Sequence, residues 1–454
     1  RMVMAAASSS TSPGREARSA GESAASVKYA KACARLQVKP EPLFLKTLRQ
    51  PREHGGSYST LKAEERITGD GLKAVVQAID GMRGLHTLGL IGLRRGDTPL
   101  LTHDGLGALV KAARTNQSLH ALDLSDNALT DDIAASHLAA LLAHNMSLTS
   151  LRLRSNSFKD KTGRQLLEAL ASNRHLLELD ISCNPGFVAW KEQPAEIDRL
   201  LRENTALASL AVSLPEAGVA PIVRHLQQHP KRLPALRLLH QKLGEPTMLQ
   251  LKSLVGSSKA AITELDLTHA YCAEAGAVAL SQALLSNHSL TRLNLAHNGI
   301  AASGAVALAD ALKINACLTD LSVAANLVND AAAVAFAEML TANEVLTSLD
   351  LGRNCFGTTG AQALRQALQA NSTLLHLGSL EGAPIGVGLR ASLEWYVRNN
   401  RRWFDRTAEE LQPKSRHHEG LLRLLPATER SLREQARAPT ADAPPNSLTR
   451  AAAD

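Results

Sequence analysis

Two histidines, His269 and His297, lie 28 residues apart, and each follows a short alternating run typical of a β-strand. If adjacent strands carry them, their imidazoles lie about 5 Å apart with Asp266 nearby, which is a partial ligand set for zinc. A zinc site needs a third and usually a fourth ligand in tetrahedral geometry, and none is evident in the sequence. The stretch "RHHEG" (416–420) does not match the H-E-x-x-H metal motif either. We therefore predict no bound metal.

Motifs for nucleophilic catalysis and phosphate binding are also missing from the sequence. It contains no G-x-x-x-x-G-K-[ST] loop, no G-x-S-x-G elbow and no linked Cys/His motif. We expect a protein that is not an enzyme and that uses no cofactor. A small-molecule ligand is not expected.

The 28-residue interval belongs to a repeat that runs through most of the chain. Its unit begins L-x-x-L-x-L-x-x-N, as in "LHALDLSDN" (119–127), "LTSLRLRSN" (148–156) and "LTSLDLGRN" (346–354). The period-two alternation predicts a short strand, and the three- and four-residue spacing in "SGAVALADALKIN" (303–315) predicts an amphipathic helix. Neither element can bury its apolar side alone, so copies must stack. The predicted fold is an α/β solenoid, a horseshoe with an inner parallel sheet and outer helices.

Two residue types that recur at a fixed position of successive repeats, here called columns, support this architecture. Glycines at 276, 304 and 360, each followed by alanine, are expected to let a helix approach the sheet closely. Where the chain turns off each strand, a buried asparagine amide can satisfy backbone groups of the bend. The asparagines at this position are Asn127, Asn156, Asn184, Asn298, Asn326 and Asn354.

The repeat length, the asparagine column and the G-A-x-A-L-x-x-A-L helices resemble the ribonuclease-inhibitor-type leucine-rich repeats. That group includes ribonuclease inhibitor, the repeat domains of NOD-like receptors and the Ran GTPase-activating protein. The resemblance covers about 57–403 and implies the repeat fold and not one function, because the members share a frame and differ in what they bind. Since no catalytic motif is present, we expect a non-catalytic protein-binding scaffold. Two alternatives stay open. One is GTPase activation through a loop arginine, Arg94 or Arg95; the other is substrate recognition within a ubiquitin-ligase or immune/effector assembly.

The charge distribution argues against a nucleic-acid groove. The formal net charge of +7 comes from the ends, with +6 over residues 1–66 and +3 over 390–454, which leaves the repeats at about −2. Aromatic residues make up only 3% of the chain, so stacking platforms for bases are few. Five cysteines without a C-x-x-C pair indicate a reducing, cytoplasmic setting. Without an 18-residue apolar run, we expect no membrane span.

Four segments are predicted along the chain. Residues 1–26 form a disordered lead, for which a transit peptide is the alternative. Residues 27–56 form a helical N-terminal cap that covers the open end of the core. Residues 57–403 hold about twelve repeats. Residues 404–454 form a basic, mostly disordered tail with a short helix near 419–437.

One or more proteins are predicted to bind the concave strand face, which points away from the core. The charges there alternate in sign between strands, so that Asp123 lies beside Arg152 and Arg152 beside Asp180. This pattern fits both mutual neutralisation and a binding surface of mixed charge. The candidate binding residues on this face are Asp123, Arg152, Arg154, Asp180, Asp266, His269, Arg292, His297, Asp350 and Arg353.

Two repeats are longer than the others, at 90–101 and 185–197. Insertions at the same point of the repeat emerge at one rim of the horseshoe, where partners often dock. Arginine and tryptophan are common interface anchors. For the two aromatic candidates, the alternative is that they fold back onto the core. The rim candidates are Arg94, Arg95, Phe187 and Trp190.

Overall fold

The computed structural model describes residues 24–37, 39–40, 61–63, 69–79, 85–229, 233–257, 261–380 and 382–410. The chain forms two compact units, Arg1–Leu179 and Asp180–Asp454. The predicted lead up to residue 23, most of the second half of the predicted cap and the predicted tail helix near 419–437 lie outside the described residues.

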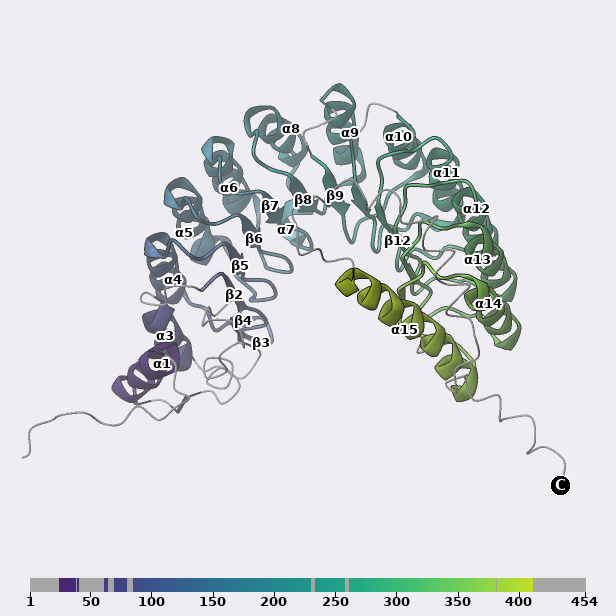
Figure 1. Cartoon of the computed structure of the whole chain (residues 1–454). Helices are drawn as coiled ribbons and strands as arrows, with labels where there is room; N and C mark the ends of the chain where they lie inside the picture. Colours follow the sequence, from purple (N-terminus) through teal and green to yellow (C-terminus); the bar gives the residue numbers. More distant parts are fainter. Residues whose placement is uncertain are drawn as a thin grey trace, which may run out of the picture. The chain divides into compact units, whose positions relative to one another are not determined.

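The first unit alternates short parallel strands with helices that cover one side of them (Figure 1). Neighbouring strands align their central leucines, Leu88 with Leu122 and Leu122 with Leu151, and all three are buried. The strands, in sheet order, are β1 (Leu61–Ala63), β2 (Thr87–Leu90), β5 (Ala121–Asp123), β6 (Ser150–Arg152) and β7 (Glu178–Asp180). The helices are α1 (Ala24–Arg35), α3 (Gly69–Ile79), α4 (His103–Thr115), α5 (Asp131–His144) and α6 (Asp160–Ser172).

The second unit repeats the same arrangement with seven described strands in sequence order (Figure 1). They are β8 (Ser209–Val212), β9 (Ala235–Leu238), β10 (Glu264–Asp266), β11 (Arg292–Asn294), β12 (Asp320–Ser322), β13 (Ser348–Asp350) and β14 (His376–Leu377). The helical segments are α7 (Pro185–Val188), α8 (Gln193–Glu203), η1 (Glu216–Gly218), α9 (Val219–Gln228), α10 (Glu245–Val255), α11 (Ala273–Leu284), α12 (Ala302–Leu312), α13 (Asp330–Ala342), α14 (Thr358–Ala370) and α15 (Val387–Glu410). The predicted α/β solenoid with a parallel sheet and covering helices is confirmed. No described helix meets the length and apolarity that crossing a bilayer requires.

The predicted asparagine column is buried and hydrogen-bonded. The Oδ1 of Asn326 accepts from the backbone N–H groups of Asn298 at 2.9 Å and Ile300 at 3.0 Å. Its Nδ2 donates to the carbonyl oxygens of Leu295 at 2.9 Å and Val323 at 3.0 Å. One amide therefore ties the turn of its own repeat to that of the repeat before it, which satisfies backbone groups that would be costly to bury alone.

A second asparagine column, at the ends of the helices, was not predicted. The Oδ1 of Asn343 accepts from the backbone N–H of Leu346 at 2.7 Å, where the chain heads into the next strand. Its Nδ2 donates to the carbonyl oxygen of Leu312 in the preceding helix at 2.7 Å. The members that share a bond from Oδ1 to a following backbone N–H are Asn116, Asn145, Asn173, Asn204, Asn287, Asn315, Asn343 and Asn371.

The glycine column has a different role from the one predicted. A Cβ on Gly360 would lie 2.6 Å from the Cβ of Ala333 in the preceding helix, and one on Gly304 would lie 3.0 Å from the Cβ of Ala277. The close approach is therefore between neighbouring helices and not between a helix and the sheet, which corrects the sequence-based interpretation. Small residues are needed there because adjacent repeats bring helix backbones near to one another.

Both longer repeats contain additional secondary structure. Residues 90–101 form a two-stranded antiparallel hairpin of β3 (Arg94–Arg95) and β4 (Thr98–Pro99). Gly96 turns it with a φ of +58°, a conformation that favours glycine. In the other, the short helix α7 precedes α8.

Candidate functional site

The strand face that the helices leave uncovered carries six of the ten residues that were predicted to lie on it. In β5, β7, β10 and β13 the central residue is buried, while the residues on either side are half-buried and lie on the opposite face. The register aligns Asp123 with Arg152, as predicted, and Arg292 with Asp320. Oppositely charged residues of neighbouring repeats therefore lie side by side within each unit.

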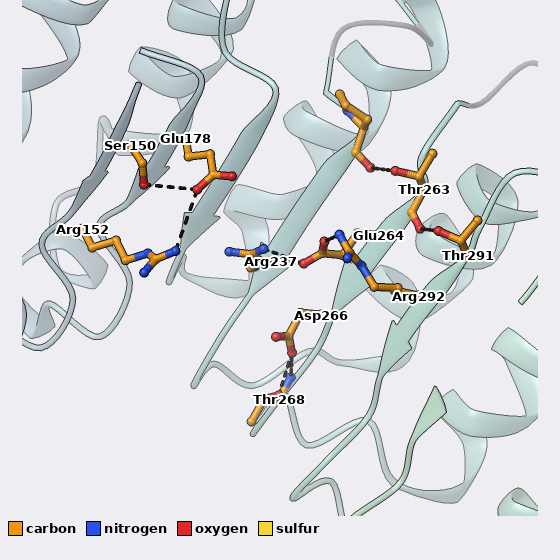
Figure 2. Close-up of polar contacts among 11 residues, drawn as sticks. Ser150, Arg152, Glu178, Arg237, Thr263, Glu264, Asp266, Thr268, Thr291 and Arg292 are labelled. Carbon is orange, nitrogen blue, oxygen red and sulfur yellow. Dashed lines mark hydrogen bonds and ion pairs between the residues drawn. The ribbon is translucent and has the colours of Figure 1, made fainter. Parts of the chain in front are cut away.

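In the second unit, one glutamate joins two arginines from neighbouring strands (Figure 2). The Nε and Nη2 of Arg237 lie 2.7 Å and 2.6 Å from the Oε1 of Glu264. The Nη2 of Arg292, in the next strand, contacts the other carboxylate oxygen. The Glu264 side chain is 13% exposed and that of Arg292 is 59% exposed, so the bridging carboxylate lies deeper than this cation.

The triad by itself carries a positive charge, and Asp320 of the next strand lies beside Arg292 in register. Two guanidinium groups share one carboxylate, so the group of three has a net charge of +1. A guanidinium presents five N–H donors in a fixed plane, and the bonds to Glu264 use only some of them. The triad of Arg237, Glu264 and Arg292 can therefore bind a further acceptor, such as a carboxylate of a partner protein.

The predicted aspartates have a structural role that the sequence reasoning missed. The Oδ1 of Asp266 accepts from the backbone N–H of Thr268 at 3.0 Å and from its hydroxyl at 2.6 Å (Figure 2). These bonds from residue i to i+2 form Asx turns that lead the chain off the strand. Equivalent bonds to the backbone two residues later are made by Asp123, Asp180 and Asp350. One oxygen of each carboxylate is therefore already used within the repeat.

In the first unit, the ion pair on this face is looser. The Nη2 of Arg152 lies 3.9 Å from the Oε2 of Glu178, and both side chains are about half exposed. The same oxygen accepts from the hydroxyl of Ser150 at 3.1 Å (Figure 2). Asp123 is adjacent in register, but the carboxylate that pairs with Arg152 is that of Glu178, which the sequence reasoning had not paired with it. Arg154 lies two residues beyond the end of β6.

Three residues predicted on the strand face lie in the turns that follow the strands. His269, His297 and Arg353 have φ values of 54°, 58° and 54°, in the left-handed region. The predicted neighbourhood of the two histidines is confirmed, since their ring centroids are 4.1 Å apart and nearly parallel. His240 was missed and extends the stack, 4.4 Å from His269. Within the described residues, no three histidine, cysteine, aspartate or glutamate side chains are grouped so as to hold a metal ion.

The rim residues of the second long repeat are buried, which corrects the prediction that they are exposed anchors. Phe187 and Trp190 are 1% and 4% exposed, and their ring centroids lie 6.4 Å apart. Phe187 lies in α7 and Trp190 follows it, and both rings are buried, so the fold-back alternative holds. They contribute to the core and do not form a docking surface.

The hairpin of the first unit holds its arginine in place. The Nε of Arg94 donates to Asp126 at 3.0 Å, and its Nη1 donates to the carbonyl of Gly96 at 3.0 Å. The guanidinium therefore braces the hairpin against the next turn. The side chain of Arg95 lies outside the described part of the chain.

A shallow groove of about 420 Å³ lies on the opposite, helical side of the second unit. It runs between α10 and α11 and is lined mainly by Leu249, Val278 and the aliphatic part of Lys252. The Lys252 ammonium donates to Gln282 across it. Its polar lining residues are Lys252, Glu274 and Gln282.

The repeats have a counterpart among known families. The model described as Leucine Rich repeat matches residues 115–136, 144–163, 172–185, 286–309 and 342–364. The chain contains leucine-rich repeats. The matched segments lie in both units, and each contains a strand together with part of a helix.

Curated relatives of this leucine-rich-repeat chain include leiomodin-1. The human protein is 33% identical over 125 residues, which are 26% of this chain and 21% of leiomodin-1. The rat protein is 30% identical over 151 residues, which are 32% of this chain and 25% of the relative. The chain thus spans about a fifth to a quarter of the length of the relatives that it matches.

Solved structures that this chain resembles in part share less sequence. They include leiomodin-1 actin-binding site 2 (23% identity, TM-score 0.31, covering 36% of this chain and 94% of that one). The tropomodulin C-terminal domain of Caenorhabditis elegans has 16% identity and a TM-score of 0.31, and covers 35% of this chain and 92% of that one. The yeast Rad7–Elc1 complex contains a chain with 17% identity and a TM-score of 0.43, which covers 72% of this chain and 82% of that one.

Proposed function

We propose that this leucine-rich-repeat protein is a non-catalytic, protein-binding scaffold, of the ribonuclease-inhibitor type, that uses the open strand face of its repeats. The observation that supports this most directly is the triad of Arg237, Glu264 and Arg292. It is a preorganised, net positive group on a face that the protein's own helices leave uncovered. Rigid side chains of this kind bind with little loss of conformational entropy.

The partner surface would carry carboxylates. Glu264 fixes both guanidinium groups, so a partner's aspartate or glutamate would meet donors that are already oriented. Arg237 and Arg292 also give specificity. An arginine or lysine of a wrong partner would meet these two like charges on either side of Glu264. The looser pair of Arg152 and Glu178 makes the first unit the weaker site, although its charges are of the same kind.

Affinity purification from cells tests this proposal with the full-length chain. The double charge reversal R237E/R292E should remove co-purifying proteins that the wild type retains, and circular dichroism checks that the variant used in the assay is folded. Arg199 is the matched control, because it is half exposed on α8 and forms an ion pair with Glu196 away from the strand face. Partners that are lost equally with R199E, or retained by R237E/R292E, would contradict the proposed site. The variant R152E/R154E tests the first unit in the same assay.

A further inference from the structure

Five residues of the second unit occupy one position in successive repeats. His240, His269, His297, Ala325 and Arg353 all have φ values between 51° and 58°. The backbone N–H of each of the first four donates to a carbonyl of the next repeat, at 3.0, 3.1, 3.0 and 2.7 Å. Because the backbone is equivalent at each position, the side chains leave it in the same direction, one above another.

The first three side chains of this ladder already form a stack of planar rings. The centroids of His240 and His269 lie 4.4 Å apart with an angle of 26° between the rings. Those of His269 and His297 lie 4.1 Å apart with an angle of 17°. Offset, nearly parallel stacking at this separation is favourable for π systems.

The fourth position interrupts the stack. Ala325 has only a methyl group there, and the fifth position brings Arg353, whose planar guanidinium can continue a stack. Two repeats span about 10 Å, so the interval between the His297 ring and the level of Arg353 has the width of one planar ring. Leu327, two residues after Ala325 in the same turn, is an apolar residue that is 55% exposed. At Gly299, in the turn beside it, an added Cβ would have no described atom within 4 Å.

We propose that this interval is a binding slot for an aromatic side chain of a partner protein. The ring would stack on the imidazole of His297, contact the methyl of Ala325 and receive Arg353 on its other face through a cation–π interaction. An aliphatic side chain would gain neither stacking interaction, and a guanidinium would meet the like charge of Arg353. The slot lies beyond the strand ends and does not depend on the proposed role of Arg237, Glu264 and Arg292.

A nucleic-acid base would also be planar, but the surroundings favour a protein. Bases bring phosphates, which lysine and arginine side chains usually neutralise. The turns at 268–274, 296–302 and 324–330 contain no lysine or arginine, and they include the acidic residues Glu274 and Asp330. Apart from Arg353, which would contact the ring itself, the slot and these turns offer no cation for the phosphates of a nucleic acid.

Methyl NMR of the full chain, with ¹³C-labelled alanine and leucine methyl groups, tests the slot directly. The probe is N-acetyl-tryptophanamide, and the Ala325 methyl is assigned by its disappearance in A325S. We expect the Ala325 and Leu327 resonances to shift upfield in a saturable manner, because both methyl groups would lie under the indole ring. N-acetyl-leucinamide, the non-planar control, should leave them unmoved.

Three variants separate binding in the slot from a change in fold. H297A and R353A each remove one wall and should raise the dissociation constant roughly 3- to 10-fold. A325H fills the slot with the residue that the same backbone conformation already accepts at three positions, so it should fold and abolish the Leu327 shift. A325S leaves the slot open and should retain that shift.

The remaining alanine methyl resonances report whether each variant is folded. The proposal is overturned if neither methyl of the folded wild type moves, or if leucinamide moves them equally. Persistence of the Leu327 shift in folded A325H would also overturn it. Tighter binding of adenosine monophosphate than of the tryptophan probe would assign the slot to nucleotides instead.

Discussion

The side chain of Asn354 accepts a hydrogen bond from the backbone N–H of Asn326, at 3.0 Å, across the boundary between two repeats. The same oxygen accepts from Val328 at 3.1 Å, and the amide nitrogen donates to the carbonyls of Val323 and Leu351 at 2.9 Å each. Asn354 is 3% exposed, so water cannot replace these partners. A single side chain thus holds the turns of two repeats in register.

Replacing Asn354 with alanine should lower the free energy of unfolding by about 3 kcal/mol or more, because several buried backbone groups lose their partners together. The control is N329A. Asn329 is an exposed helix N-cap whose loss should cost about 1 kcal/mol. Urea denaturation followed by circular dichroism measures both. Equal midpoints for the two variants would contradict the role given to the asparagine column.

Removing the carboxylate of Glu264 should destabilise the second unit by about 1–2 kcal/mol, because the two arginines that reach it from the flanking strands β9 and β11 then repel each other. E264Q preserves the shape of the side chain and isolates the effect of charge. E178Q in the first unit is the matched control, since Glu178 pairs with one arginine at 3.9 Å and is half exposed; its effect should be below about 0.5 kcal/mol. Salt should partly restore E264Q, because it screens the repulsion. A loss of stability that does not respond to salt would point to packing instead.

The helix start at Gly360 leaves no room for a methyl group. G360A would place a Cβ 2.6 Å from that of Ala333, so we expect a loss of about 1–3 kcal/mol from overpacking. G386A is the control, since an added Cβ there has no described atom within 4 Å. Thermal unfolding should separate the two variants by several degrees. A G360A variant as stable as G386A would show that the helices can move apart without penalty.

Burial raises the pKa of the Cys272 thiol from its ordinary value of 9.0 to about 12. At pH 9 such a thiol is ionised in about one molecule in 1,000, so alkylation of Cys272 in the folded chain should be very slow. Cys355 is exposed and should be modified first. Peptide mass spectrometry after timed iodoacetamide treatment measures both rates. Equal rates at the two cysteines in the folded chain would contradict the burial of Cys272.

The same raised pKa predicts a pH dependence of stability. The folded state holds the thiol proton more tightly than the unfolded state, so the contribution is complete below pH 9 and falls as the pH rises from about 9 toward 12. C272A removes this dependence. Denaturation midpoints between pH 8 and 10.5 should therefore decline more steeply for the wild type than for C272A.

The sequence predicted the strands well, because alternation of apolar and polar residues within a few positions is enough to identify them. Leu293 and Leu321 alternate with polar neighbours and recur at 28 residues, so the strand, its buried face and its register follow directly. It predicted less where a side chain has two physically reasonable positions. Phe187 and Trp190 could point outward or inward, and only the turn made by α7 decides between them.

Two further features were not predicted: the place of His240 in the histidine stack, because the repeat spacing is irregular there, and the burial of the helix-end asparagines. His240 lies 29 residues before His269, in a repeat whose asparagine is replaced by Gln241, so the column was not recognised there. Asn315, Asn343 and Asn371 recur at intervals of 28 residues, so the sequence did contain a signal for the helix-end asparagine column. Asparagine at a helix end is ordinarily solvated, and its burial depends on the neighbouring repeat.

Asn400, within α15, donates from its side-chain amide to the carbonyl oxygens of Asn371 at 3.2 Å and Leu374 at 3.1 Å. It lies 29 residues after Asn371 and thus continues the helix-end asparagine series, although it lies within α15 and not at a helix end. The helix α15 therefore supplies to the repeat before it the same kind of amide donor that an asparagine of the following repeat supplies elsewhere. Expression boundaries placed before residue 400 would leave those two carbonyls to water, and fraying would then begin at that end of the stack.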